Sequence, residues 1–163
     1  TKEPAARMTE LALALGKKLN LSNSELNRLS LIASLHDIGK TNISEKILNK
    51  RAKLTKEEWQ LMQEHSERGY KIVTASEEFA VIAEEIFDHH ERWDGNGYPR
   101  ALSGEDIPYL ARIISIIDAY DVMTHSRPYG KAVSKKEALV EIKNCAGSQF
   151  DPELVEEFIE MMK

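Results

Sequence analysis

Hydrophobic residues recur at helical spacing along most of this chain. Between Pro4 and about Leu19, leucine, alanine and methionine return every three or four positions with charged residues between them, which predicts an amphipathic helix. A second helix is expected to start at a cap formed by Ser22 or Asn23 and to end at Gly39. The dipeptide His36-Asp37 follows the apolar residues of this helix directly, so its end carries the first candidate functional residues.

The same periodicity predicts further helices and no strand. One should run from Thr55 through His65 and past Tyr70, with Gly69 as a weak point, and the next should begin at Ser76 and end in His89-His90. Three more are expected over residues 108–121, 134–146 and 151–162, whereas residues 41–54 should form loop and short helical turns. The prediction is therefore an all-α fold: a compact bundle of about seven helices with a metal site at its centre, in a single domain spanning residues 1–163.

Composition narrows the classes of function. The chain has 163 residues, of which 42% are hydrophobic and 30% charged, as in ordinary globular domains. A formal net charge of -5 without a basic stripe argues against binding to a nucleic-acid polymer. No apolar run reaches the length of about 18 residues that membrane insertion needs, and no signal-peptide pattern is present. The single cysteine, Cys145, suits a reducing compartment and a helix-packing role.

Histidines and aspartates at the predicted helix ends form the main candidate site. The candidate ligands are His36, Asp37, His65, His89, His90 and Asp118. Helical bundles can bring such ends together around a pair of metals, and nitrogen and carboxylate ligands without thiolates favour Fe, Mn or a similar divalent ion. Asp37 is the natural bridge, because each of its two oxygens can bind one metal. Two metals roughly 3.5–4 Å apart would convert a bridging water into a hydroxide able to attack phosphorus.

Each of these residues also has a simpler interpretation. A His-Asp dipeptide occurs often by chance, His65 could be a surface residue of a helix, and the pair His89-His90 could be an exposed helix end. Asp118 directly follows a buried apolar run, so it would need a buried partner if it bound no metal. Their combined placement favours the metal site. His125 lies a helical turn or more beyond Asp118 and is expected to be exposed.

The ordered motifs resemble one family. They are Leu35-His36-Asp37-Ile38-Gly39-Lys40, His65, His89-His90-Glu91, Gly97-Tyr98-Pro99, Asp118-Ala119-Tyr120-Asp121 and Arg127-Pro128-Tyr129. In this order and over nearly the whole chain they resemble the HD-GYP family, which comprises all-helical bacterial metal-dependent phosphohydrolases of the HD superfamily. The resemblance implies a bacterial cytoplasmic phosphodiesterase that opens cyclic di-GMP to linear pGpG, and in some members continues to GMP.

The resemblance also implies roles for individual residues. His36, Asp37 and Asp118 would hold one metal, and Asp37, His65, His89 and His90 the other. Lys40 would stabilise charge at the scissile phosphate or protonate the leaving oxygen. Arg127 would clamp a phosphate, Tyr98 would contact the substrate, and Lys131 is a weaker candidate for a phosphate contact. The resemblance further implies that the Gly95–Pro99 loop contacts GGDEF domains. The start at Thr1 suggests that the chain is the C-terminal part of a longer protein with an upstream sensor or receiver domain.

One position departs from the family pattern. Members usually carry a histidine in the first helix just upstream of the run that here reads Arg7-Met8-Thr9-Glu10-Leu11-Ala12, and Pro4 occupies that position. Because proline offers no side-chain ligand, the first metal would lack one protein ligand. Three readings stay open: an active cyclic di-GMP phosphodiesterase; a catalytically impaired module that binds cyclic di-GMP or a GGDEF partner; and a hydrolase for another cyclic dinucleotide or a nucleotide monoester.

Overall fold

The computed structural model describes residues 3–50, 52–125 and 130–163. Its α-helices are α1 (Pro4–Lys18), α2 (Asn23–Leu35), α3 (Glu45–Leu48), α4 (Lys56–Gln63), α5 (His65–Thr74), α6 (Ala83–Asp88), α7 (Tyr109–Thr124), α8 (Lys135–Asn144) and α9 (Pro152–Met161). Short 3-10 helices are η1 (Ile38–Asn42), η2 (Ala80–Ile82) and η3 (Gly104–Asp106). The described residues contain no β-strand, which confirms the predicted all-α fold.

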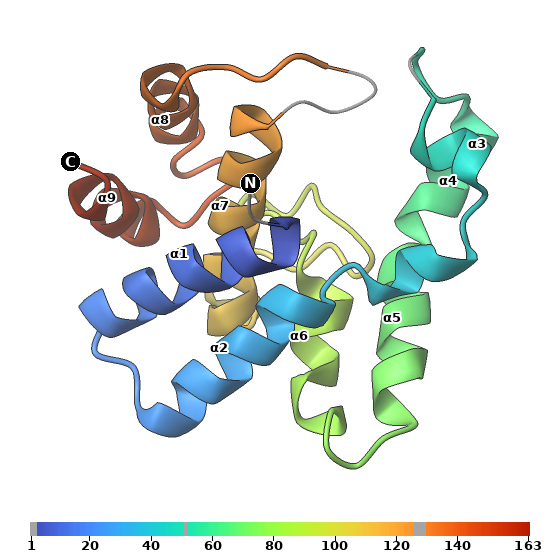
Figure 1. Cartoon of the computed structure of the whole chain (residues 1–163), viewed down its shortest axis with the longest axis horizontal. Coiled ribbons are helices and arrows are strands. Elements are labelled where there is room, and N and C mark those ends of the chain that lie inside the picture. Colours follow the sequence, from blue (N-terminus) through green and yellow to red (C-terminus); the bar gives the residue numbers. More distant parts are fainter. Residues whose placement is uncertain (1–2, 51, 126–129) are drawn as a thin grey trace.

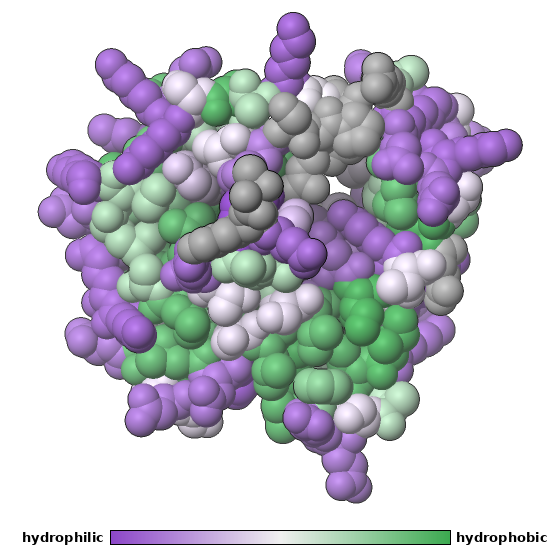
Figure 2. Space-filling model, viewed as in Figure 1, coloured by the Kyte–Doolittle hydropathy of each residue, from purple (hydrophilic) through white to green (hydrophobic). Residues whose placement is uncertain are grey.

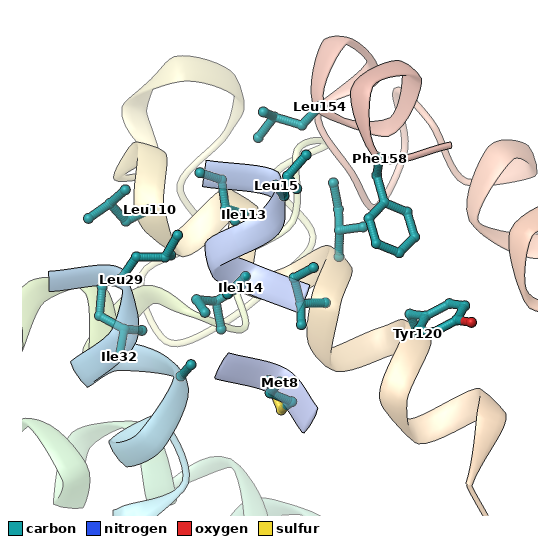
Figure 3. Packing of buried hydrophobic residues seen from close by; sticks show 14 of the residues in the cluster. Met8, Leu15, Leu29, Ile32, Leu110, Ile113, Ile114, Tyr120, Leu154 and Phe158 are labelled. Carbon is teal, nitrogen blue, oxygen red and sulfur yellow. The ribbon is translucent and has the colours of Figure 1, made fainter. Parts of the chain in front are cut away.

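Helix α7 forms the centre of the bundle (Figure 1). It carries a broad apolar face, on which Ile113, Ile114, Ile116 and Ile117 are all fully buried. Apolar residues of α1, α2, α8 and α9 pack around it; Figure 3 shows Met8 and Leu15 of α1 and Phe158 of α9 among them. No helix of the described chain is both long enough and apolar enough to cross a bilayer.

Local capping signals explain where several helices begin. Ser22 accepts a hydrogen bond from the backbone N–H of Glu25, whose carboxylate accepts one in return from the backbone N–H of Ser22. Thr55 and Glu58 form the same reciprocal pair at the start of α4. Each pair satisfies donors that a helix start leaves free, so both helices begin where the sequence predicts.

The connection from α2 to α5 differs from the prediction. Helix α2 ends at Leu35, and Gly39 lies inside η1 instead of ending α2. A Cβ added at Gly39 would overlap the carbonyl oxygen of His65 and would lie 2.7 Å from the backbone nitrogen of Gly69. Glycine is therefore required at position 39 because η1 packs directly on the backbone of α5, and Gly69 is part of this contact instead of a weak point.

Two predicted helices are also shorter or divided. The helix expected from Thr55 past Tyr70 is split into α4 and α5, which meet at Glu64. The helix expected from Ser76 begins with turns and η2, and only Ala83–Asp88 is α-helical. Both changes put a metal-ligand candidate at a break in the helix: His65 opens α5, and His89 directly follows α6.

Candidate metal centre

Two groups of candidate ligand atoms come together, each within 4.8 Å. One group comprises Asp37, His65, His89 and His90, and the other His36, Asp37 and Asp118. They come from the turn after α2, the start of α5, the end of α6 and the middle of α7. All six predicted ligands are thus gathered, in the two sets that the resemblance implies, and the sets share Asp37.

The two carboxylate oxygens of Asp37 face different partners. Oδ1 lies 3.6 Å from Nε2 of His65 and 3.7 Å from Nε2 of His89. Oδ2 lies 3.2 Å from Nε2 of His36 and 3.4 Å from Nζ of Lys40. One oxygen is therefore directed toward each group, which is the arrangement a bridging carboxylate needs.

Three histidines are oriented by the backbone just before them. In each, Nδ1 lies within hydrogen-bonding distance of the carbonyl oxygen three residues earlier: His36 with Ala33 (3.0 Å), His65 with Met62 (2.5 Å) and His89 with Ile86 (2.6 Å). A carbonyl oxygen can only accept, so Nδ1 carries the proton and donates it. In the neutral ring the lone pair then lies on Nε2, the atom that faces the cluster, as in metal-binding histidines whose other nitrogen is held by a neighbouring group.

Two polar atoms of the cluster lack hydrogen-bond partners within the described chain. Nε2 of His36 and Oδ1 of Asp37 are buried and accept or donate no hydrogen bond within the described chain. Nε2 of His65 lies 3.4 Å from that of His89 and 3.1 Å from that of His90. Converging lone pairs and unpaired buried atoms are costly without a cation. The donor set therefore fits divalent metal ions.

Electrostatics differ between the two groups. Burial and the nearby His89 lower the pKa of His65 to about 4, and burial with the same neighbour puts the pKa of His90 well below its usual range. Burial acts in the same direction on His36, but Asp37 and Asp118 outweigh it and raise its pKa to about 10. His65 and His90 are thus ready as neutral ligands, whereas His36 holds a proton until a cation replaces it.

The candidates for substrate contact have different positions. The Tyr98 ring stacks on His90, with ring centroids 5.1 Å apart and planes inclined by 24°. Burial raises the pKa of the Tyr98 hydroxyl, and Asp37 and Asp118 add to the shift, so this hydroxyl stays protonated. Lys131 is exposed. Arg127 lies outside the described residues, so its expected phosphate contact stays a prediction.

A second set of charged residues holds the loop that carries Tyr98. The carboxylate of Glu91, only 2% exposed, accepts hydrogen bonds from the backbone N–H groups of Arg100 (2.5 Å) and Leu102 (2.9 Å). The fully buried Asp88 pairs with the guanidinium of Arg100. The sequence analysis missed these roles; the signal was two acidic residues flanking a buried histidine pair, since buried carboxylates need partners.

Gly97 lets the same loop fold back onto the histidines. A Cβ at this position would lie 2.5 Å from the backbone nitrogen of Arg92 and 2.6 Å from the carbonyl oxygen of His90. No side chain fits in that space. The glycine of the Gly-Tyr-Pro motif thus brings Tyr98 against His90.

Pro4 is the first residue of α1, where proline costs little. One turn later, Arg7 forms a two-pronged ion pair with the buried Asp121 of α7, with distances of 2.9 and 3.2 Å. His125 was expected to be exposed, but its side chain is only partly so and lies 3.4 Å from the same carboxylate. It is not among the clustered ligands.

Comparisons with known proteins agree with this geometry. The HD domain family model matches residues 1–154. A cyclic di-GMP phosphodiesterase of Thermotoga maritima is 36% identical over 96% of this chain and 43% of its own length. A cyclic di-GMP phosphodiesterase response regulator of Xanthomonas campestris is 38% identical over 92% of this chain and 40% of its own length. A 3'3'-cGAMP-specific phosphodiesterase of Vibrio cholerae is 36% identical over 98% of this chain and 32% of its own length.

Solved structures show the same arrangement of helices. A cyclic GMP-AMP-specific phosphodiesterase of V. cholerae superposes with a TM-score of 0.78 at 25% identity, covering 99% of this chain and 44% of that protein. An HD-GYP-type protein of Bdellovibrio bacteriovorus has the same TM-score at 22% identity, which speaks for the fold alone. The chain spans about two fifths of the length of the first relatives. The matches over nearly all of this chain identify it as a member of the HD domain family, of the HD-GYP type.

Proposed function

We propose that this domain is a metal-dependent phosphodiesterase that hydrolyses cyclic di-GMP to pGpG and can continue to GMP. The observation that carries the proposal is the shared carboxylate of Asp37, with one oxygen toward each histidine group and Lys40 at 3.4 Å. Relatives with cyclic dinucleotide phosphodiesterase names support the substrate class. The comparisons offer no support for an impaired module.

The proposed metal set comprises two divalent ions, Fe or Mn, because the donors are imidazole nitrogens and carboxylate oxygens. Asp37, His65, His89 and His90 would hold one ion, and His36, Asp37 and Asp118 the other. When bound, such a pair supplies Lewis acidity and an acidic water between its members. Asp37 keeps its negative charge in this setting: burial alone would raise its pKa, but His36, His89 and Lys40 hold it well below the usual range.

Lys40 and the aromatic loop would complete the chemistry. Water adds to phosphorus, the bond from phosphorus to the ribose 3' oxygen breaks, and that oxygen must gain a proton. The ammonium group of Lys40 is partly exposed beside Asp37, so it can approach the phosphate and donate that proton or balance its charge. Tyr98 would contact the substrate through its protonated hydroxyl, and Arg127 and Lys131 would bind the second phosphate.

A second substrate has a specific observation in its favour. Several relatives from V. cholerae carry the name 3'3'-cGAMP-specific phosphodiesterase at 34–36% identity. Both cyclic dinucleotides present the same phosphates to the cluster and differ in one base. Cyclic di-GMP and 3'3'-cGAMP should therefore be assayed side by side, and a preference for the second by more than about tenfold would change the named substrate but not the reaction.

The proposal extends to the longer protein. We expect residues 1–163 to be one domain of a regulated bacterial cytoplasmic protein with a sensor or receiver domain upstream. The loop from Gly95 to Pro99 is partly exposed and is the proposed contact for a GGDEF partner. Pull-down with and without substitution of Asn96, an exposed loop residue, tests that contact.

The first experiment measures metal content and turnover on the same anaerobically purified sample. About two ions per chain together with pGpG formation are expected. Asp37→Asn keeps the shape of the side chain but removes its charge, so metal content should fall at both positions and turnover by about 100-fold or more. Full metal content in Asp37→Asn would refute the bridging role, and a metal-loaded wild type that cleaves no cyclic dinucleotide would refute the function.

A further inference from the structure

Trp59 is a large aromatic side chain that the fold leaves unburied. It lies in the middle of α4, and 48% of it is exposed. Helix α4 has no fully buried residue, and it extends with α3 beyond the body of the bundle (Figure 1). Hydrophobic packing within the domain therefore does not account for a tryptophan at this position.

One aromatic ring, that of Tyr98, lies between Trp59 and the candidate metal ligands. The centroid of Trp59 lies 6.5 Å from that of Tyr98, with the planes inclined by 77°. Tyr98 in turn stacks on the candidate metal ligand His90 at 5.1 Å. A series of neighbouring aromatic groups thus leads from the ligands to a ring that is about half exposed.

Contacts along the chain connect the helix of Trp59 to the metal centre. The capping pair of Thr55 and Glu58 anchors the start of α4, and Lys50 adds an ion pair to Glu58 at 2.5 Å. Helical hydrogen bonds continue through Glu64 into α5, which begins with the candidate ligand His65. Figure 2 shows a hollow with hydrophilic residues between this projecting part and the body of the bundle.

A cyclic dinucleotide matches this arrangement. Its phosphates would lie at the cluster, so each purine must extend away from the ligands by the length of one nucleoside. Bases stack on exposed aromatic rings, and one such contact contributes on the order of 10- to 100-fold in affinity with little dependence on base identity. The exposed face of Trp59 beside Tyr98 is the aromatic surface that this geometry makes available.

We infer that Trp59 is a substrate-positioning residue that stacks on one purine of the dinucleotide while its phosphate is bound at the metal centre. The inference rests on the proposed function and extends it by naming the residue that holds the base. Stacking is tolerant of the base, so Trp59 contributes to affinity for cyclic di-GMP and for 3'3'-cGAMP equally. It does not select between them.

Steady-state kinetics of three variants of the metal-loaded protein test the inference. Trp59→Ala should raise KM for both dinucleotides by about 10- to 100-fold and change kcat by less than about threefold, because the reacting groups are untouched. Trp59→Phe should restore most of the affinity. Leu61→Ala, at a residue of the same helix that is 40% exposed, should leave KM unchanged.

Hydrolysis of bis(4-nitrophenyl) phosphate separates stacking from a structural effect on the centre. This diester has no purine, so Trp59→Ala should cleave it as the wild type does. An unchanged KM for the dinucleotides in Trp59→Ala would overturn the inference. An equal loss on the purine-free diester would overturn it as well, since the substitution would then act on the metal centre.

Fluorescence tests binding independently of turnover. The chain has two tryptophans, so Trp93→Phe leaves Trp59 as the single reporter. A non-hydrolysable phosphorothioate analogue of cyclic di-GMP should quench this emission, because a stacked purine is a quencher. Quenching without hydrolysis of any cyclic dinucleotide by the wild type would refute the proposed function and keep the stacking. Hydrolysis without quenching would refute the stacking alone.

Discussion

Gly39→Ala should damage the metal centre through the backbone of a neighbouring helix. The added Cβ would overlap the carbonyl oxygen of His65 and would lie 2.7 Å from the nitrogen of Gly69, whereas an ordinary contact is about 3.5 Å. Helix η1 must therefore move away from α5 by about 1 Å or more, because the carbonyl oxygen of His65 is the nearest atom. The neighbours are backbone atoms, so no flexible side chain can absorb the change.

The magnitude follows from that displacement. Overpacking of this kind costs about 1–3 kcal/mol, and the upper end is expected because backbone faces backbone. For a domain of this size, about 3 kcal/mol corresponds to a decrease in Tm of roughly 6–12 °C. Asp37 and Lys40 flank the displaced residue, so a shift of close to 1 Å should reduce turnover by about 100-fold.

Two further glycine-to-alanine variants serve as controls for Gly39→Ala. At Gly69 an added Cβ would meet the Cγ2 atom of Ile86 at 2.9 Å, a side-chain atom that can adjust, so Gly69→Ala should cost less, about 1 kcal/mol. At Gly130 an added Cβ meets no described atom within 4 Å, and Gly130→Ala should leave Tm unchanged or slightly raised. Thermal unfolding by circular dichroism gives Tm, and elemental analysis gives metal content. If Gly39→Ala melted with the wild type and kept its metal, the close approach of η1 and α5 would be wrong.

Three further substitutions test separate contacts. Pro4→His should raise metal content at the group containing His36 if that ion lacks a ligand; unchanged content by elemental analysis would mean that another group already supplies it. Glu91→Gln removes the negative charge that accepts the backbone hydrogen bonds of the loop, so Tyr98 should lose its position. Turnover should then fall by about 10-fold while the metal content stays unchanged, and a loss of metal would contradict this. Asp94→Asn addresses acid stability: hydrogen bonds from Arg92 and the Asn96 backbone lower the pKa of Asp94 from 3.8 to about 2, so its stabilising contribution is present above pH 3.8 and is lost as the pH falls toward 2. The variant should therefore show a shallower loss of Tm over this range, and an identical acid profile would refute the pairing.

The sequence was informative wherever the signal was local. Periodicity located α1, α2, α7, α8 and α9, because each buries one or more apolar faces whose residues recur every three or four positions. The candidate metal ligands could also be found, because these histidines and aspartates lie at the ends of predicted helices or directly after apolar runs. These features depend on residues close together along the chain.

Features that depend on distant residues could not be read in the same way. Gly39 looked like a helix terminator, because nothing near it in sequence reveals that α5 approaches its backbone. The break at Glu64 has no glycine or proline to mark it, so α4 and α5 read as one helix. The buried Asp88 and its partner, the exposed Arg100, are separated by a loop, and only the folded chain brings these charges together.

The backbone bonds at Nδ1 of three histidines have a consequence for how this centre can change. Each ring takes its orientation from a carbonyl oxygen in its own stretch of main chain, and almost any residue can supply that oxygen. These bonds therefore do not depend on the side chains of Ala33, Met62 and Ile86, although Ala33 and Ile86 are fully buried and their replacements must fit the core. Side chains around the centre can therefore diverge, within the limits of core packing, while the orientation of the three imidazoles is preserved by the main chain.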